Sequence, residues 1–260
     1  MTPTPQEMPA RDDESELRSN RDRIVISGMS GLFPDSRHVK DLAEKLYNKE
    51  NPIKVATRWS YSHPEASQYS GTVPGLDRFD AQFFKVYYRL AMNMDSMGRK
   101  VLEQAYQAIY DSGINPDSLN GKKIAVFIGA CFSETEKYCF YMVNTKTGLG
   151  IAGCSKAMFS NRVSYWLNAK GPSVTIDDAC ASSLVALQQA YEAIKRGDCE
   201  AAIVAGINLT LHPQPTVHYA RMVKMSQDGK TRSFDENAAG FCRTEAINVL
   251  FIQKSQDAKR

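Results

Sequence analysis

A cysteine lies where a strand-like run meets a helical pattern, in the stretch TIDDACASSLVALQQAYEAIKRGD (residues 175–198). A thiolate at this position, Cys180, would gain from the unpaired backbone N–H groups of the first helical turn and from the helix dipole. Its neighbours Ala179, Ala181 and Ser182 are small, so a substrate carbonyl has room to approach. The backbone N–H of Cys180 itself can stabilise an oxyanion. These features indicate a nucleophile for covalent catalysis.

A purely structural role accounts for the same cysteine equally well. A thiol behaves as a small hydrophobic group and fills tight places in protein cores. In that interpretation Asp177 and Asp178 are polar turn residues. Their carboxylates would also disfavour a neighbouring thiolate by like-charge repulsion. The junction alone leaves both interpretations of Cys180 open, packing and catalysis.

Periodic apolar residues predict the elements that position this cysteine. Leu184, Leu187, Tyr191 and Ile194 recur at helical spacing, which predicts a helix over residues 180–196 with this face buried. The other predicted elements are strands at 23–28, 122–130, 171–179 and 200–209, one or two strands within 240–254, and helices at 38–50, 94–113 and 155–168.

The alternation of strands and helices predicts an α/β fold, with a mainly parallel sheet and helices on both faces. Sites in such sheets lie at the carboxyl ends of strands, which is where Cys180 falls. Gly28 and Gly31 follow the first predicted strand, but their spacing matches no phosphate-binding loop. These two glycines therefore predict a tight turn.

The composition is that of a soluble globular protein, with 43% hydrophobic residues, 23% charged residues and a net charge of +3. The sequence has no run of Lys and Arg residues of the kind that indicates nucleic-acid binding. No apolar stretch approaches the roughly 20 residues that a membrane span needs. The N-terminus lacks the apolar core of a secretory signal, so we expect a cytoplasmic protein. The cysteine spacings fit no zinc signature and predict no metal site. We expect residues 1–22 to form a disordered tail before one domain at 23–260.

The segment DDACASSLVAL resembles the active-site segment of the β-ketoacyl synthases, DTACSSSLxAL. Further blocks resemble the same family in the same order: ISGMSGLFP, LDRFDAQFF, MDSMGRKVLEQAYQAIYDSGINPDSL, FSNRVSYWLNAKGPSVTID, EAAIVAGINL and SQDGKTRSFDENAAGFCRTEA. Details in AGCSKAMFSNR and GFCRTEA look closest to the ketosynthase of animal-type fatty acid synthase, with modular polyketide synthases as the near alternative. The resemblance implies a layered, thiolase-like fold, of which this chain holds the N-terminal half, and a homodimer.

The resemblance also implies a chemistry. Cys180 would accept an acyl group from a phosphopantetheine thioester carried by acyl carrier protein, which is the implied partner. A malonyl thioester would then lose CO₂, and its carbanion would attack the acyl-enzyme. This reaction is the decarboxylative Claisen condensation of a 3-oxoacyl-[acyl-carrier-protein] synthase, an acyltransferase of fatty acid biosynthesis. The resemblance implies no cofactor bound within this chain.

Some features depart from the family's pattern. Asp178 stands where threonine is usual, and Ala181 stands where serine is usual. The family's two catalytic histidines belong to HGTGT-like and GHxEAAAG-like motifs, and this chain contains neither motif. Its histidines are His38, His63, His212 and His218. We therefore expect the chain to be truncated before the C-terminal half that carries the catalytic histidines, and the isolated chain to condense poorly.

Three alternatives remain open. The first is a catalytically inactive ketosynthase-like fragment that serves as a dimerisation or carrier-protein-docking module. The second is the ketosynthase of a polyketide synthase. The third is a cysteine hydrolase built on a nucleophile elbow, but the segment lacks the Gly-x-x-x-Gly frame of that motif.

Overall fold

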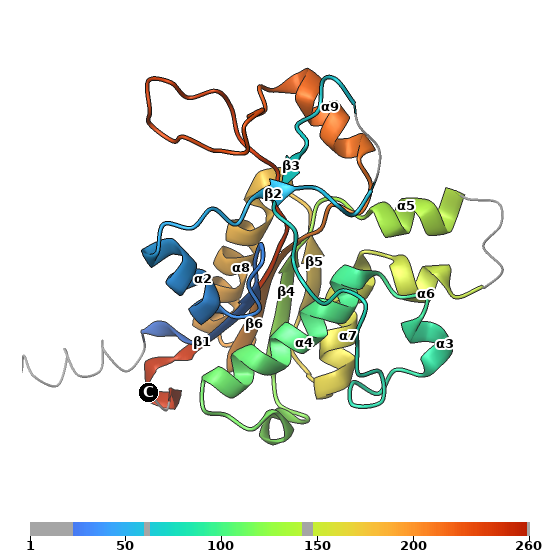
Figure 1. Cartoon of the computed structure of the whole chain (residues 1–260). Coiled ribbons are helices and arrows are strands. Elements are labelled where there is room, and N and C mark those ends of the chain that lie inside the picture. Colours follow the sequence, from blue (N-terminus) through green and yellow to red (C-terminus); the bar gives the residue numbers. More distant parts are fainter. Residues whose placement is uncertain (1–22, 60–62, 142–147, 259–260) are drawn as a thin grey trace, which may run out of the picture.

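A five-stranded sheet forms the centre of the protein in the computed structural model, which describes residues 23–59, 63–141 and 148–258 (Figure 1). The strands are β1 (Ile24–Leu32), β4 (Ile124–Gly129), β5 (Ser173–Ile176), β6 (Ala201–Asn208) and β7 (Ala246–Lys254). Their order across the sheet is β1–β7–β6–β4–β5. The predicted tail, residues 1–22, lies outside the described residues.

Four strands of this sheet run in one direction, and β7 runs against them. β4 is parallel to β5 and β6, whereas β7 is antiparallel to both β6 and β1. The connection explains this direction, because residues 209–245 do not cross back over the sheet, and β7 begins at Ala246 opposite Asn208. The predicted α/β fold is confirmed, but the reversed β7 pairs antiparallel with both of its neighbours and makes the sheet mixed.

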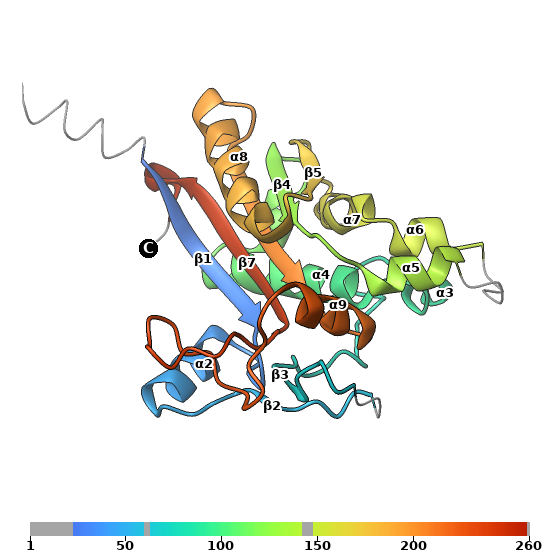
Figure 2. The same ribbon diagram turned by 90° about the horizontal axis from the view of Figure 1, so that it is seen from above.

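Helices cover both faces of the sheet, as predicted. Figure 2 shows α8 on one face and α4 and α7 on the other. The helices are α2 (Val39–Tyr47), α3 (Tyr88–Ala91), α4 (Ser96–Asp111), α5 (Glu134–Tyr141), α6 (Gly150–Cys154), α7 (Ala157–Leu167), α8 (Ser182–Arg196) and α9 (Gln214–Met222). α2, α4, α7 and α8 are the helices that the sequence predicted, with ends that differ by a few residues. Within the described ranges, no helix combines the length and the apolar character needed to cross a membrane.

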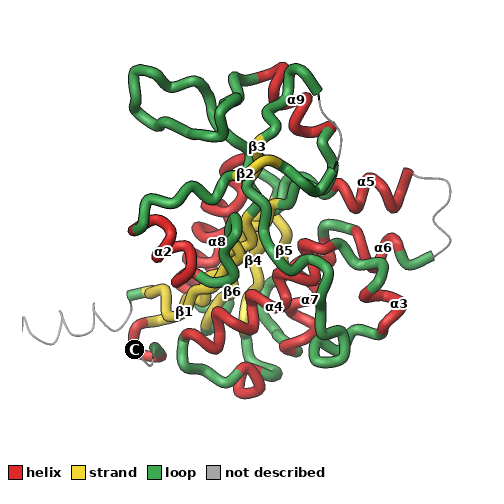
Figure 3. Tube along the Cα trace, in the orientation of Figure 1, coloured by secondary structure: helices red, strands yellow, loops and turns green. Residues whose placement is uncertain are grey.

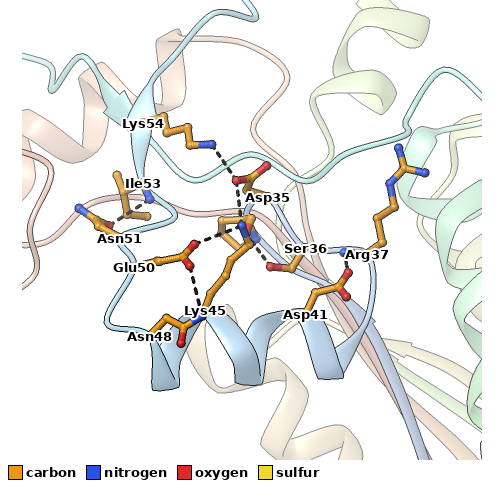
Figure 4. A network of polar contacts seen from close by, with 11 residues as sticks. Asp35, Ser36, Arg37, Asp41, Lys45, Asn48, Glu50, Asn51, Ile53 and Lys54 are labelled. Carbon is orange, nitrogen blue, oxygen red and sulfur yellow. Dashed lines mark hydrogen bonds and ion pairs between the residues drawn. The ribbon is translucent and has the colours of Figure 1, made fainter.

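A small ribbon of two strands, β2 (Lys54–Val55) and β3 (Tyr69–Ser70), lies among long loops beyond the sheet (Figure 3). Asp35 connects this ribbon to α2, because its carboxylate accepts hydrogen bonds from Lys45 at 3.1 Å and from Lys54 at 2.7 Å (Figure 4). These two ammonium groups, that of Lys54 above all, lower the pKa of Asp35 below its usual value. The loop region is thereby attached to the helix that follows β1.

The two faces of the sheet are packed with side chains of different size. On the face of α4 and α7, Leu102, Ile109 and Phe159 are each at most 1% exposed. On the opposite face, α8 meets β4 and β6 through small residues, including the fully buried Ala186 and Ala190. These alanines let α8 lie close to the sheet.

The buried face of α8 differs from the predicted one. Ile194 is buried and Leu187 is half-buried, but Leu184 is 71% exposed and Tyr191 is 39% exposed. Helical spacing identifies an apolar face without identifying the neighbour that covers it. Here the alanines meet the sheet, and the described part of the chain leaves much of the larger apolar face of α8 uncovered.

Gly28 lies inside a strand rather than in the predicted tight turn. β1 continues through Gly31 to Leu32, with a shift in its register against β7 between Ile26 and Gly28. A Cβ atom on Gly28 would lie 2.1 Å from the carbonyl oxygen of Ala108 in α4. The turn prediction is wrong because the glycine is needed for close packing of the helix backbone on the strand.

Gly28→Ala is expected to lower the free energy of unfolding by about 1–3 kcal/mol, the usual cost of overpacking. The clash is with backbone, so α4 has to move away from β1. Gly98→Ala is the matched control, because the first atom its Cβ would meet is on the Phe159 ring at 3.5 Å, and alanine favours the helix by about 1 kcal/mol. Urea unfolding followed by circular dichroism compares them, and equal stability of both variants would contradict the packing role of Gly28.

Candidate active site

Cys180 lies in a tight turn between β5 and α8, as the sequence predicted. The turn is one 3-10 segment, Ala179–Ala181, and α8 begins immediately after it at Ser182. The Cys180 side chain is exposed. Ala179 has a φ of 46°, in the left-handed region that residues other than glycine seldom adopt. Such strained residues are concentrated at active sites, and a sharp strand-to-helix turn presents the nucleophile in enzymes of the α/β-hydrolase fold.

Ser182 fixes the strained turn through its side chain. The Asp178 backbone N–H donates to Ser182 Oγ at 2.8 Å, and this hydroxyl donates to the carbonyl of Ala179 at 2.7 Å. The Ala181 N–H donates to the Asp178 carbonyl at 3.0 Å. Because Ser182 is only 5% exposed and belongs to α8, these bonds attach the turn rigidly to the start of the helix.

The two aspartates before the cysteine lie in different surroundings. Asp177 forms an ion pair with Lys156, with 2.7 Å between Oδ2 and Nζ. The Lys156 ammonium, assisted by the Cys131 thiol and the Ala179 N–H, lowers the pKa of Asp177 below its usual value. Asp178 is exposed and contributes its backbone N–H to the turn. Among the described residues, Asp177 is thus the carboxylate that forms an ion pair beside Cys180.

A cavity of about 620 Å³ opens beside Cys180 at the carboxyl ends of β4 and β6. Three thiols line it, those of Cys131, Cys180 and Cys242. Burial raises the pKa of Cys131, with the nearby Asp177 adding to the shift, and burial also raises the pKa of Cys242. Among these three, Cys180 is the exposed one and the one that sits at the start of a long helix.

Gly129 lets the helix that follows Cys180 approach the sheet. It is the last residue of β4 and pairs with Ile176 on one side and Gly206 on the other. A Cβ atom on Gly129 would lie 2.6 Å from the backbone of both Ser182 and Ser183. Sequence patterns did not identify Gly129, Lys156 or Cys131 as site residues, although the glycine does end a predicted strand.

Among the described residues, no histidine lines the cavity beside Cys180. His38 precedes α2 and is exposed, and His63 belongs to the loop region. His212 and His218 are exposed and line a second cavity of about 700 Å³ between α5 and α9. In the part of the chain that the structure describes, the site therefore has a thiol and a shaped cavity without an imidazole next to the thiol.

The comparisons with known sequences agree in one family. The family model for the "Beta-ketoacyl synthase, N-terminal domain" matches residues 21–258. A fatty acid synthase of Anser anser anser is 39% identical over 238 residues, which are 91% of this chain and 68% of that sequence. The pikromycin polyketide synthase component PikAII of Streptomyces venezuelae is 36% identical over 240 residues, covering 92% of this chain and 6% of that protein.

Solved structures show the same relationship in three dimensions. A ketosynthase from module 6 of the bacillaene synthase of Bacillus subtilis 168 superposes with a TM-score of 0.79 at 32% identity, over 90% of this chain. The oxazolomycin ketosynthase domain OzmH KS7 of Streptomyces albus JA3453 gives a TM-score of 0.83 at 28% identity, also over 90% of this chain. This chain spans 40% and 44% of those two ketosynthases, respectively.

Proposed function

This chain belongs to the β-ketoacyl synthase family, and we propose that it is the N-terminal half of a fatty acid synthase ketosynthase in which Cys180 accepts the acyl group. The observation that carries this proposal is the position of Cys180. Its exposed thiol sits on a strained turn before a 15-residue helix and borders a cavity at the carboxyl edge of the sheet. Backbone N–H groups at such a helix start stabilise a thiolate and a developing oxyanion.

In the proposed reaction, the Cys180 thiolate attacks the carbonyl carbon of an acyl-phosphopantetheine thioester on acyl carrier protein. A new C–S bond forms, the old one breaks, and the phosphopantetheine sulfur leaves with the proton that Cys180 has lost. A malonyl thioester then releases CO₂, and the electron pair of the broken C–C bond stays on its α-carbon. This carbanion attacks the acyl carbonyl, which releases Cys180 and yields a 3-oxoacyl thioester.

We also propose acyl carrier protein as partner, a homodimeric assembly and a cytoplasmic location, on the basis of the family. The uncovered apolar face of α8, with Leu184 71% exposed, supports the family's two-half architecture, because the second half of a thiolase-like fold would cover such a face. The similarity to polyketide synthases supports an elongation step of the same class with a polyketide product as the second assignment.

A non-catalytic docking or dimerisation module is a third candidate function, and one observation favours it. No histidine lines the cavity beside Cys180 within the described residues. General acid–base assistance contributes about 10²–10⁴-fold to such reactions. We therefore expect this chain by itself to become acylated but to release little CO₂ from a malonyl thioester.

Acylation of the 260-residue chain tests the proposal. After incubation with acetyl-CoA or octanoyl-CoA, which present the same phosphopantetheine thioester, intact-mass measurement is expected to show one acyl adduct, and peptide mapping is expected to place it on Cys180. Cys180→Ala removes the adduct, and Cys199→Ala, at a buried thiol between the end of α8 and the start of β6, leaves it unchanged. The absence of an adduct on the unmodified chain, or an adduct that survives Cys180→Ala, would refute the assignment.

A further inference from the structure

Three segments of the chain meet at one ammonium group, that of Lys156. This residue immediately precedes α7, and its Nζ lies 2.7 Å from Oδ2 of Asp177. The same Nζ donates a hydrogen bond to the carbonyl oxygen of Cys131, two residues after β4 ends. Lys156 therefore connects the start of α7 with the segments that follow β4 and β5.

Asp177 extends this connection to the turn that presents the nucleophile. Its Oδ1 accepts a hydrogen bond from the Ala179 backbone N–H at 3.4 Å, and its carboxylate also interacts with the Cys131 thiol. Ala179 is the residue with the left-handed backbone, directly before Cys180. The carboxylate that Lys156 holds is therefore one of the groups that keep the strained residue in place.

We infer that Lys156 is a positioning residue for Cys180, because it orients the Asp177 carboxylate and neutralises its charge. This inference rests on the proposed role of Cys180 as the nucleophile. A thiolate next to an unpaired carboxylate is disfavoured by like-charge repulsion. Of the two carboxylates in the sequence DDAC, Asp177 is the one that pairs with a cation among the described residues, and this cation lies 21 positions away in the sequence.

Solvent exposure determines how large this effect can be. The side chains of Lys156 and Asp177 are 32% and 44% exposed, so dissolved ions screen both charges. An exposed ion pair that served only the fold would contribute little and would leave the reactivity of Cys180 unchanged. A charge-neutralising role instead predicts a change in reactivity that depends on salt and on Asp177.

The test measures the rate at which iodoacetamide alkylates Cys180 in the full chain, followed by peptide mass spectrometry because other thiols are present. In about 10 mM salt, where the Debye length is about 30 Å, Lys156→Met is expected to slow alkylation about three- to tenfold. In 1 M salt, where this length is about 3 Å, most of the difference disappears. Lys123→Met, at an exposed lysine next to the amino end of β4, is the control and retains the original rate.

The double variant Lys156→Met with Asp177→Asn provides the decisive comparison, because asparagine still offers an oxygen to the Ala179 N–H but carries no charge. Its alkylation rate is expected to return to within about twofold of the rate of Asp177→Asn alone. An unchanged rate in Lys156→Met would overturn the inference. A loss of rate that neither salt nor Asp177→Asn relieves would overturn it too, as it would indicate a structural role. Alkylation of Cys180 by iodoacetamide does not require acyl transfer. If the acyl adduct failed to form, this result would therefore count against the proposed function alone.

Discussion

Glu245→Ala is expected to destabilise the protein by about 3–5 kcal/mol, the cost of removing one partner from a buried ion pair. Glu245 is 0% exposed and forms a bidentate ion pair with the guanidinium of Arg58. Its carboxylate also accepts hydrogen bonds from the backbone N–H groups of Val73 at 2.8 Å and Thr210 at 2.9 Å. The substitution leaves a guanidinium and two buried N–H groups without this acceptor.

Because of the location of Glu245, its removal is expected to affect several segments of the chain. This residue directly precedes β7, Thr210 follows β6, and Arg58 and Val73 belong to the loop region beyond the sheet. One carboxylate therefore holds three parts of the chain together at the edge of the sheet where Cys180 lies. A loosened loop region is expected to increase the susceptibility of this edge to proteases along with the loss of stability.

Urea unfolding followed by circular dichroism measures this effect, with Glu44→Ala as the matched control. Glu44 forms an ion pair with Lys40 at 3.9 Å on the surface of α2, and both side chains are more than 60% exposed. Its removal is expected to change stability by less than about 0.5 kcal/mol. If Glu245→Ala lowered the free energy of unfolding by no more than Glu44→Ala, the buried network would have no stabilising role.

Local patterns in the sequence were sufficient to predict the order and type of the main elements. Apolar patterns located the strands β4, β5 and β6 and the helices α4, α7 and α8. A short apolar run marks a strand and helical spacing marks a helix, and each pattern lies within a single element. The cysteine at the junction after β5 was predicted in the same way, since the end of a strand and the start of a helix are both local features.

Contacts between distant residues were beyond such patterns. Arg58 and Glu245 are 187 positions apart, and Arg58 lies in a stretch that looked like plain loop. The reversed direction of β7 depends on the course of residues 209–245, which its own apolar run does not encode. The sequence pattern around Gly28 predicted a turn. The true reason for the glycine is the close approach of α4 at Ala108, which is about 80 positions away and leaves no signal near Gly28.

Gly129→Ala is the second substitution from which we expect a large effect, because it acts on the helix start that holds the turn of Cys180, the proposed nucleophile. The added Cβ would lie 2.6 Å from the carbonyl carbon of Ser182 and from the backbone nitrogen of Ser183. These are backbone atoms of the first turn of α8, so the helix start has to move rather than a side chain. The overpacking is expected to cost about 1–3 kcal/mol of stability.

The same displacement is expected to slow acylation of Cys180 much more than it lowers stability. Ser182 holds the Asp178 N–H and the Ala179 carbonyl through its hydroxyl, so a shift at the helix start is passed to the turn. A misplacement of about 1 Å costs up to about 10²-fold in rate, and we expect at least a tenfold loss of acyl adduct formation from octanoyl-CoA.

Alanine substitutions at two other glycines serve as comparisons, because the space around each glycine differs. Gly206→Ala would bring a Cβ to 2.8 Å from the Ser183 Cβ and 3.0 Å from the Asn248 Oδ1, so the effect is expected to be intermediate because these contacts are longer than the 2.6 Å backbone contacts at Gly129. Among the described residues, no atom lies within 4 Å of a Cβ placed on Gly148, so Gly148→Ala is expected to behave like the unmodified chain. If Gly129→Ala retained both the original stability and the original rate of acylation, close contact between β4 and α8 would not be what places Cys180.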